Sequence, residues 1–276
     1  GKLYGDLTVA CLDENEFMIF GSGAAQEMHR RWFESHMNKF NVKYSNRSDD
    51  FHGISIAGPK SRDLLQKLVR EDISNDNFKF RDARRIFVAG VPAIVNRISF
   101  TGELGYEIYV APHFQLKLYE EIENAGKEFN LKPFGGRALM SMRLEKSWGA
   151  WTLDFRPDFT AKESGLDIFI DWKKDFIGKK SAEKDKSNLK LTPLIVETKD
   201  IDVTNNEAVM KDGKSIGYIT SGGYAHYVKK SIAYSYLDET ICKSNEKFQV
   251  EINGDFYDCS IIKQPLYDPK GIKMRS

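Results

Sequence analysis

Residues 85–110 read RIFVAGVPAIVNRISFTGELGYEIYV, and this stretch decides the fold class. It contains three β-prone runs, at Arg85–Val88, Val91–Arg97 and Tyr106–Val110, which are rich in branched and aromatic side chains. Apolar residues then recur at helical spacing over Gln115–Phe129. Strands followed by a helix that can cover an apolar face predict an α+β architecture.

The same signals continue on both sides of this stretch. We predict strands at Leu7–Leu12, at Phe17–Phe20 and from Gly53, and helices at Ala24–Phe40, from Pro59 or Ser61, and at Arg137–Trp148. The acidic, Asn-containing segment between the first two strands favours a turn. The first two thirds of the chain are therefore expected to form a mixed domain of strands and helices.

The last part of the chain has a different pattern. Short β-type runs follow one another, and Asp212-Gly213 and Asn253-Gly254 are strong signals for tight hairpin turns. These features predict a small all-β barrel or sandwich. The Lys-rich stretch Lys179–Lys190 interrupts the hydrophobic pattern, so we place the boundary there, with one domain at 1–185 and a C-terminal β-barrel domain at 190–276.

Composition excludes several classes of function. The 276 residues contain 41 Lys and Arg against 40 Asp and Glu, so no global field draws the protein to nucleic acid or to a membrane surface. The cysteines Cys11, Cys242 and Cys259 are scattered, which predicts neither a disulfide framework nor a zinc site. No apolar run is long enough to span a bilayer. We expect a cytoplasmic protein, or one of the mitochondrial matrix in a eukaryote.

Two segments carry side chains suited to ligand binding. Glu103 and Glu107 lie among closely spaced glycines, so they either turn toward a shared cleft or remain solvated. Arg143 lies late in a predicted helix and is followed by Trp148 and Trp151. A guanidinium beside aromatic rings suits a flat anionic ligand, although a helix-surface charge and two core tryptophans give the same pattern.

Familiar motifs for other chemistry do not occur in this sequence. There is no strand followed by G-x-G-x-x-G, no P-loop, no H-E-x-x-H and no G-x-S-x-G. The five histidines do not cluster at metal-ligand spacing. We therefore predict neither a dinucleotide fold nor a metal site in this chain.

Seven motifs together resemble one known family. In order, they are GKLYGDLTV at the start, AGPK, SFTGELGYE, MRLEK, ESGL, DFIGK and TSGGY. They resemble the C-terminal folate-binding half of the dimethylglycine and sarcosine dehydrogenase family, which is related to the glycine-cleavage T-protein. The resemblance covers essentially the whole chain. It implies an aminomethyltransferase fold with antiparallel sheets and helices, followed by a small β-barrel.

The resemblance also implies which residues form the site. Asp6 matches the acidic residue beside the reactive nitrogen of tetrahydrofolate and is the expected catalytic residue. Glu107 matches the pterin-binding glutamate, and Phe100 matches an aromatic residue that is often Tyr and contacts folate. Arg143 matches a helix arginine, and Trp151 matches an aromatic residue that is often Tyr in T-proteins. These four residues are the expected folate-binding residues.

The activity implied by the resemblance is capture of a one-carbon unit. A flavin domain, normally upstream in the same chain and holding FAD, oxidises an N-methyl amine to an iminium. Tetrahydrofolate takes up the carbon as 5,10-methylenetetrahydrofolate. We also expect that the family's first strands and the flavin domain precede Gly1 in a longer polypeptide.

Two alternatives remain open. A stand-alone T-protein would act on an aminomethyl group held by a lipoyl carrier protein, but residues 146–158 look more like the dehydrogenase version of this segment. A non-catalytic folate-binding protein of the iron–sulfur-maintenance branch would carry a Cys-containing motif. The corresponding stretch from Lys146 has no Cys.

Overall fold

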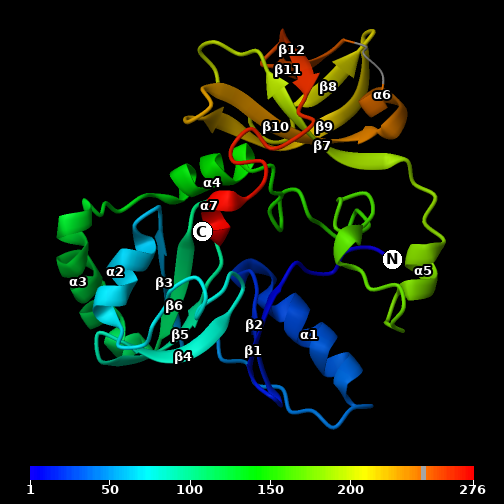
Figure 1. Cartoon of the computed structure of the whole chain (residues 1–276). Coiled ribbons are helices and arrows are strands. Elements are labelled where there is room, and N and C mark those ends of the chain that lie inside the picture. Colours follow the sequence, from blue (N-terminus) through cyan, green and yellow to red (C-terminus); the bar gives the residue numbers. More distant parts are fainter. Residues whose placement is uncertain (244–246) are drawn as a thin grey trace. The chain divides into compact units, whose positions relative to one another are not determined.

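The computed structural model describes residues 1–243 and 247–276, and contacts divide the chain into two compact units. The sheet unit consists of Leu7–Leu139 and Lys270–Ser276, and the barrel unit consists of Gly1–Asp6 and Met140–Pro269. Both are drawn in Figure 1, and each is described by itself. This division follows contacts within the structure and not a boundary along the sequence. The domain boundary expected near residues 185–190 therefore stays a prediction.

A four-stranded antiparallel sheet organises the sheet unit. Its strands follow the order β3 (His52–Ala57), β6 (Gly105–Val110), β5 (Val91–Asn96) and β4 (Ala83–Val88). The strand predictions for residues 85–110 are confirmed to within two residues at each end. All three strand pairs are antiparallel: the short turn between Val88 and Val91 joins β4 to β5, whereas β3 pairs with β6 across a long connection that contains α2.

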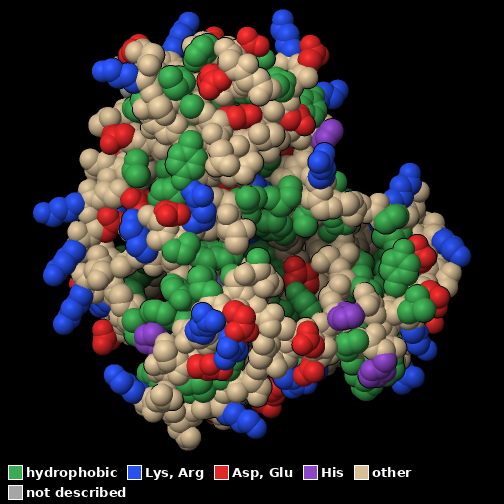
Figure 2. Space-filling view, turned by 180° about the vertical axis from the view of Figure 1, so that it is seen from behind, with side chains coloured by type: hydrophobic (Ala, Val, Ile, Leu, Met, Phe, Trp, Pro, Cys, Tyr) green, Lys and Arg blue, Asp and Glu red, His purple; other side chains and the backbone are tan. Residues whose placement is uncertain are grey.

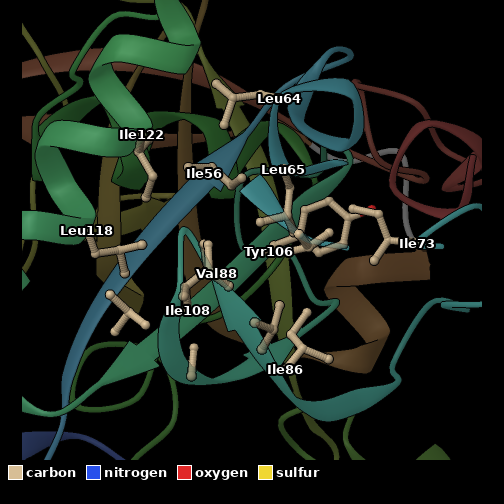
Figure 3. Close-up of a cluster of buried hydrophobic side chains, with 14 of the residues drawn as sticks. Ile56, Leu64, Leu65, Ile73, Ile86, Val88, Tyr106, Ile108, Leu118 and Ile122 are labelled. Atoms are coloured by element: carbon tan, nitrogen blue, oxygen red, sulfur yellow. The ribbon is translucent and has the colours of Figure 1, made fainter. Parts of the chain in front are cut away.

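Helices α2 (Ser61–Leu68) and α3 (Gln115–Gly126) supply apolar side chains to one face of this sheet. Figure 3 shows Leu64 and Leu65 of α2 and Leu118 and Ile122 of α3 around the strand residues Ile56, Ile86, Val88, Tyr106 and Ile108. Each large aliphatic side chain buried here contributes about 1.5–3 kcal/mol relative to an exposed one. This core makes the sheet a rigid support for its opposite face.

Strand β6 shows how the two faces differ. Tyr106, Ile108 and Val110 are at most 1% exposed and point into the core, whereas Glu107 and Tyr109 are half-buried. Successive side chains of a strand point to opposite faces, so Glu107 and Tyr109 lie on the face away from α2 and α3. Polar side chains can therefore gather there without disturbing the core.

A separate hairpin precedes the sheet. Strands β1 (Thr8–Asp13) and β2 (Glu16–Phe20) form a two-stranded antiparallel sheet, followed by helix α1 (Gln26–Met37). Val9 and Phe17 are 58% and 60% exposed. A two-stranded hairpin gains little stability alone, and exposed apolar side chains beside free strand edges promote association with other chains.

The barrel unit contains six strands that close on themselves. Their order is β10 (Lys230–Asp238), β7 (Leu189–Val196), β12 (Asp255–Ile261), β11 (Phe248–Ile252), β8 (Ala208–Lys211) and β9 (Lys214–Ala225). The predicted barrel is confirmed and the alternative sandwich is wrong. Asp212 and Asn253 have φ values of 50° and 54°, and the glycine after each also has positive φ. Two-residue hairpin turns require this geometry.

Three predicted helices end earlier than expected: α1 ends at Met37 rather than Phe40, and α3 ends at Gly126 rather than Phe129, where a short 3-10 turn follows. The helix predicted to reach Trp148 ends at Glu145, where α4 (Gly136–Glu145) is followed by Ser147 at φ 56°. The N–H of Trp148 bonds to the carbonyl of Arg143, and the N–H of Ser147 bonds to Leu144, which is the pattern of a Schellman C-cap. In the barrel, β9 extends to Ala225, because its pairing with β10 continues as far as Lys230↔Ala225.

The remaining helices are short. They are α5 (Lys179–Glu183), α6 (Glu239–Lys243) and α7 (Ile272–Arg275). Within the described residues, no helix has the length and apolar character needed to cross a bilayer. On the face drawn in Figure 2, Lys and Arg side chains are interspersed with Asp and Glu side chains, as the balanced composition predicts.

The core of the sheet unit provides a first test. Replacing Ile108, which is fully buried, with Ala is expected to lower the free energy of unfolding by about 2–5 kcal/mol, since it removes apolar contacts and leaves a cavity. The control is Leu116→Ala on α3, where the leucine is 68% exposed and the expected change is within about 0.5 kcal/mol. Urea denaturation followed by circular dichroism compares the two variants. Equal losses would show that β6 does not anchor this core.

Candidate functional site

Glu107 is the best-defined polar group on the outer face of the sheet. Tyr109, two residues along β6, donates its hydroxyl to Oε2 of Glu107 at 2.6 Å. Burial and then the charge of Glu107 raise the pKa of Tyr109 well above its ordinary value, so the phenol remains a donor. Within the described part of the chain, Oε1 of Glu107 makes no hydrogen bond. The carboxylate is thus oriented by one internal donor and can accept another from a ligand.

The turn before β6 fixes where Phe100 lies. The N–H groups of Gly102 and Glu103 donate to the hydroxyls of Ser99 and Thr101 at 3.2 Å each. Gly102 has φ 84°, a conformation that favours glycine. Phe100 is half-buried within this closed turn. These local hydrogen bonds fix the backbone of the turn from which the Phe100 ring projects.

The two carboxylates of this segment have different surroundings. Oε1 of Glu103 lies 3.6 Å from Nζ of Lys273, which belongs to α7 of the same unit. Glu107 has no ion pair among the residues described. Glu103 therefore has a structural partner, and Glu107 is the better candidate for ligand binding.

Asp6 belongs to the other unit. Residues 1–6 are held there by a bridge between Lys2 and Thr160 and by the N–H of Leu3, which donates to the carbonyl of Phe159 at 2.8 Å. The Asp6 side chain keeps access to solvent, and partial desolvation raises the pKa of its carboxyl above the ordinary value of 3.8. This carboxylate is a stronger base than an ordinary surface aspartate.

Arg143 lies inside the barrel unit and is 1% exposed. Its Nη1 donates to Oδ2 of Asp154 at 2.7 Å and to the carbonyl of Trp148 at 2.9 Å. Asp154 is fully buried and is the ion partner of this guanidinium. Arg143 therefore acts directly on the segment that follows α4.

Asp154 collects four hydrogen-bond donors. Besides Arg143, they are the N–H of Ala150 at 2.9 Å, the hydroxyl of Ser221 at 2.7 Å and the hydroxyl of Thr220. A buried carboxylate is stable only when its lone pairs are used in this way. Asp154 thus joins α4, the segment 148–155 and strand β9.

Trp151 lies in the segment that Asp154 holds. It is half-buried, and its backbone forms a bridge with Phe155. The N–H groups of Leu153, Asp154 and Phe155 all bond to the carbonyl of Ala150. The structure therefore brings Arg143 and the Trp151 segment together in the barrel unit, while Phe100 and Glu107 lie in the sheet unit.

Several contributing residues were missed in the sequence. Thr220 and Ser221 fall in the TSGGY motif, which was noticed only as a family signature. Asp154 had no local signal, because its four donors come from four separate positions. Tyr109 could have been found from its i, i+2 relation to Glu107, which places both on one face of a strand.

Comparison with known proteins agrees with this architecture. Residues 1–174 match the family described as the GCVT N-terminal domain, and residues 190–268 match the glycine cleavage T-protein C-terminal barrel domain. A crystal structure of the glycine cleavage system aminomethyltransferase T from Bartonella henselae superimposes with a TM-score of 0.85. At 19% identity over 97% of this chain and 73% of that one, this match shows the fold.

Sequence relatives come from two groups. The chain is 36% identical to mitochondrial dimethylglycine dehydrogenase of Homo sapiens over 274 residues, covering 96% of this chain but 32% of that protein. It is 30% identical to an aminomethyltransferase of Desulfitobacterium hafniense, covering 98% of this chain and 74% of that protein. The chain thus spans about a third of the length of the dehydrogenases it matches.

An α+β sheet unit combined with a closed six-stranded barrel defines the aminomethyltransferase class of fold. The chain belongs to the glycine cleavage T-protein family.

The buried ion pair of the barrel unit provides a second test. Asp154→Ala is expected to lower the free energy of unfolding by about 3–5 kcal/mol, because it leaves the Arg143 charge buried without a counter-ion. The double variant Arg143→Met, Asp154→Leu removes both charges and should recover most of that loss. Thermal and urea unfolding measure both. A double variant no more stable than Asp154→Ala would mean that the Thr220 and Ser221 bonds matter more than the ion pair.

Proposed function

We propose that this chain is the folate-handling part of an enzyme that demethylates dimethylglycine, sarcosine or a related N-methyl amine. The observation that favours this function is the higher identity to dimethylglycine dehydrogenase, 36%, than to the aminomethyltransferases, which are 29–30% identical. The half-buried Glu107 carboxylate, oriented by Tyr109, supports binding of a ligand rich in N–H groups. Tetrahydrofolate is such a ligand.

Each expected site residue has a role within this proposal. Glu107 accepts hydrogen bonds from the amino and ring N–H groups of the pterin. Phe100 packs against the ring system and, lacking a hydroxyl, contributes contact rather than a hydrogen bond. Trp151 adds a second aromatic surface. Arg143 positions the Trp151 segment through Asp154 and the Trp148 carbonyl.

Asp6 is the proposed catalytic residue. Tetrahydrofolate supplies nitrogen nucleophiles that take up a one-carbon unit as 5,10-methylenetetrahydrofolate. The Asp6 carboxylate accepts a proton at the reacting nitrogen or stabilises positive charge there, tasks that require its ionised form. Partial desolvation raises the pKa of the Asp6 carboxyl above its ordinary value of 3.8, which strengthens the carboxylate as a base.

The amine oxidation belongs to another part of the proposed enzyme. FAD would be held by a flavin domain in the same polypeptide, and the iminium produced there would be the one-carbon donor. A folate nitrogen would bond to the iminium carbon, and the bond from that carbon to the amine nitrogen would break, which releases the demethylated amine. The proposed location is the cytoplasm, or the mitochondrial matrix in a eukaryote, and one relative that supports the latter is the mitochondrial dimethylglycine dehydrogenase of Homo sapiens.

A stand-alone aminomethyltransferase remains the second candidate. The matched share of the relatives' length favours this candidate, because the chain spans 72–74% of the aminomethyltransferases and only about a third of the dehydrogenases. An assay with an aminomethylated lipoyl carrier protein and tetrahydrofolate distinguishes the two. Turnover with that carrier, and none with an N-methyl amine iminium, would favour the aminomethyltransferase.

Folate binding is tested by Glu107→Gln. Loss of a charge-assisted hydrogen bond costs about 1.5–3 kcal/mol, so the Kd for folinate should rise about 10- to 150-fold in calorimetric titration. The matched control is Glu103→Gln, which removes a carboxylate from the same segment that pairs with Lys273. Its Kd should stay within about twofold of the wild-type value. Equal effects of the two changes would count against Glu107 as the pterin residue.

The role of Asp6 is tested by pH dependence. The rate of one-carbon transfer should fall as the pH drops through the raised pKa of Asp6, because protonation removes the base. Asp6→Asn should slow transfer by about 10²–10⁴-fold, remove this acidic limb and leave the folinate Kd nearly unchanged. Single-turnover kinetics between pH 4 and 8 provide the measurement. Lost affinity at an unchanged rate would show that Asp6 binds folate and does not catalyse.

A further inference from the structure

Asn96, the last residue of β5, is an unusual polar group in the sheet unit. It is only 2% exposed, yet neither Oδ1 nor Nδ2 of its amide has a hydrogen-bond partner in the described parts of the chain. Buried amides normally find partners, because an unmade hydrogen bond in a low-dielectric interior is costly. A buried amide left in this condition calls for an explanation, and one explanation is a ligand that completes its hydrogen bonds.

The register of the sheet shows which way this amide points. Asn96 pairs directly with Glu107 on β6, and its preceding residue Val95 is fully buried in the core. Paired residues of antiparallel strands share a face, with their Cβ atoms roughly 4.5–5.5 Å apart. The amide therefore lies beside the Glu107 carboxylate on the face away from the core.

The other neighbours of Asn96 do not satisfy it. Across the β4 side it faces Ala83, whose methyl group offers no hydrogen bond. Two residues back along β5 is Ile94, which is 6% exposed and apolar. Within the sheet, the amide is thus a donor and an acceptor whose neighbours on this face are two apolar residues and a carboxylate.

We propose that Asn96 is a second recognition residue for the pterin, acting beside Glu107. This inference rests on the proposed folate function. Glu107 as a carboxylate can only accept hydrogen bonds, whereas the amide both accepts and donates. Together they complement a ring edge on which N–H donors adjoin a carbonyl oxygen or ring nitrogen, which is the edge of a 2-amino-4-oxopteridine.

Measuring both the melting temperature and the Kd for folinate distinguishes a ligand-binding role of Asn96 from a structural one. Asn96→Leu replaces the amide with an apolar side chain of similar size. If the amide is completed only by the ligand, the substitution should leave the melting temperature of the free protein unchanged or higher. The Kd for folinate should rise about tenfold, because groups on the ring edge lose their partners. If the amide instead stabilises the fold, Asn96→Leu should lower the melting temperature and leave the Kd for folinate unchanged.

The experiment is a calorimetric titration with folinate together with thermal unfolding of the wild type, Asn96→Leu and Ser55→Ala. Ser55 is the exposed neighbour of Glu107 on the other side, in β3, and serves as the matched control. Its replacement should change the Kd by less than about twofold. If Asn96→Leu does not fold, Asn96→Ala should show the same weakening.

The outcomes separate this inference from the proposed function. Folinate binding by the wild type with an unchanged Kd in both Asn96 variants would overturn the role of Asn96 and leave the folate function intact. A lower melting temperature with an unchanged Kd would identify Asn96 as a structural residue. If titration of the wild-type protein to saturating folinate gives no heat of binding, both the role of Asn96 and the proposed folate function are overturned.

Discussion

The carboxylate of Asp154 is the constraint on which the barrel unit depends. It is fully buried and receives hydrogen bonds from Arg143, Ala150, Thr220 and Ser221. These donors belong to a helix, a loop and a barrel strand, so the carboxylate fixes three elements that no continuous secondary structure joins. A charge in this position has no solvent to replace a missing donor, which makes the arrangement nearly all-or-none. The segment carrying Trp151 takes its conformation from this centre.

In the sheet unit, strand geometry separates an apolar face, which packs in the core, from a face that carries polar side chains. In β6, the alternation of side chains gives Tyr106, Ile108 and Val110 to the core and Glu107 and Tyr109 to the opposite face. A residue at Gly105 with a Cβ would meet the carbonyl oxygens of Ile56 and Ile98 at 3.2 and 3.3 Å, so glycine permits the close approach that starts the strand. The rigid core therefore fixes the backbone from which the polar side chains project.

Much of this architecture could be predicted, because its causes are local. Runs rich in branched and aromatic side chains located β4, β5 and β6, and the Asp-Gly and Asn-Gly pairs located two hairpins of the barrel. The end of α4 could not be predicted, since Ser147 adopts positive φ without the glycine or asparagine that usually signals such a cap. The hydrogen bonds to Asp154 could not be predicted from the sequence either, because its donors Arg143 and Ser221 are brought together only by the fold.

The candidate site was predictable only in part. Glu107 and Arg143 drew attention by charge and spacing, but spacing could not show that Arg143 pairs internally or that Glu103 has Lys273 as a partner. Asp6, Phe100 and Trp151 came from the family resemblance, and their roles stay predictions. Asn96 has no sequence signal, because an asparagine at the end of a strand is ordinary until its register and burial are known.

The buried polar groups of this protein fall into two kinds, and the difference bears on function. Asp154 has its donors supplied from within the fold, so it contributes to structure and has little left for a ligand. Asn96, by contrast, has an unmet donor and acceptor. This condition costs stability in the free protein and is relieved when a complementary partner arrives. The contrast between the satisfied Asp154 and the unsatisfied Asn96 beside Glu107 supports the proposal that a polar ring binds on the outer face of the sheet.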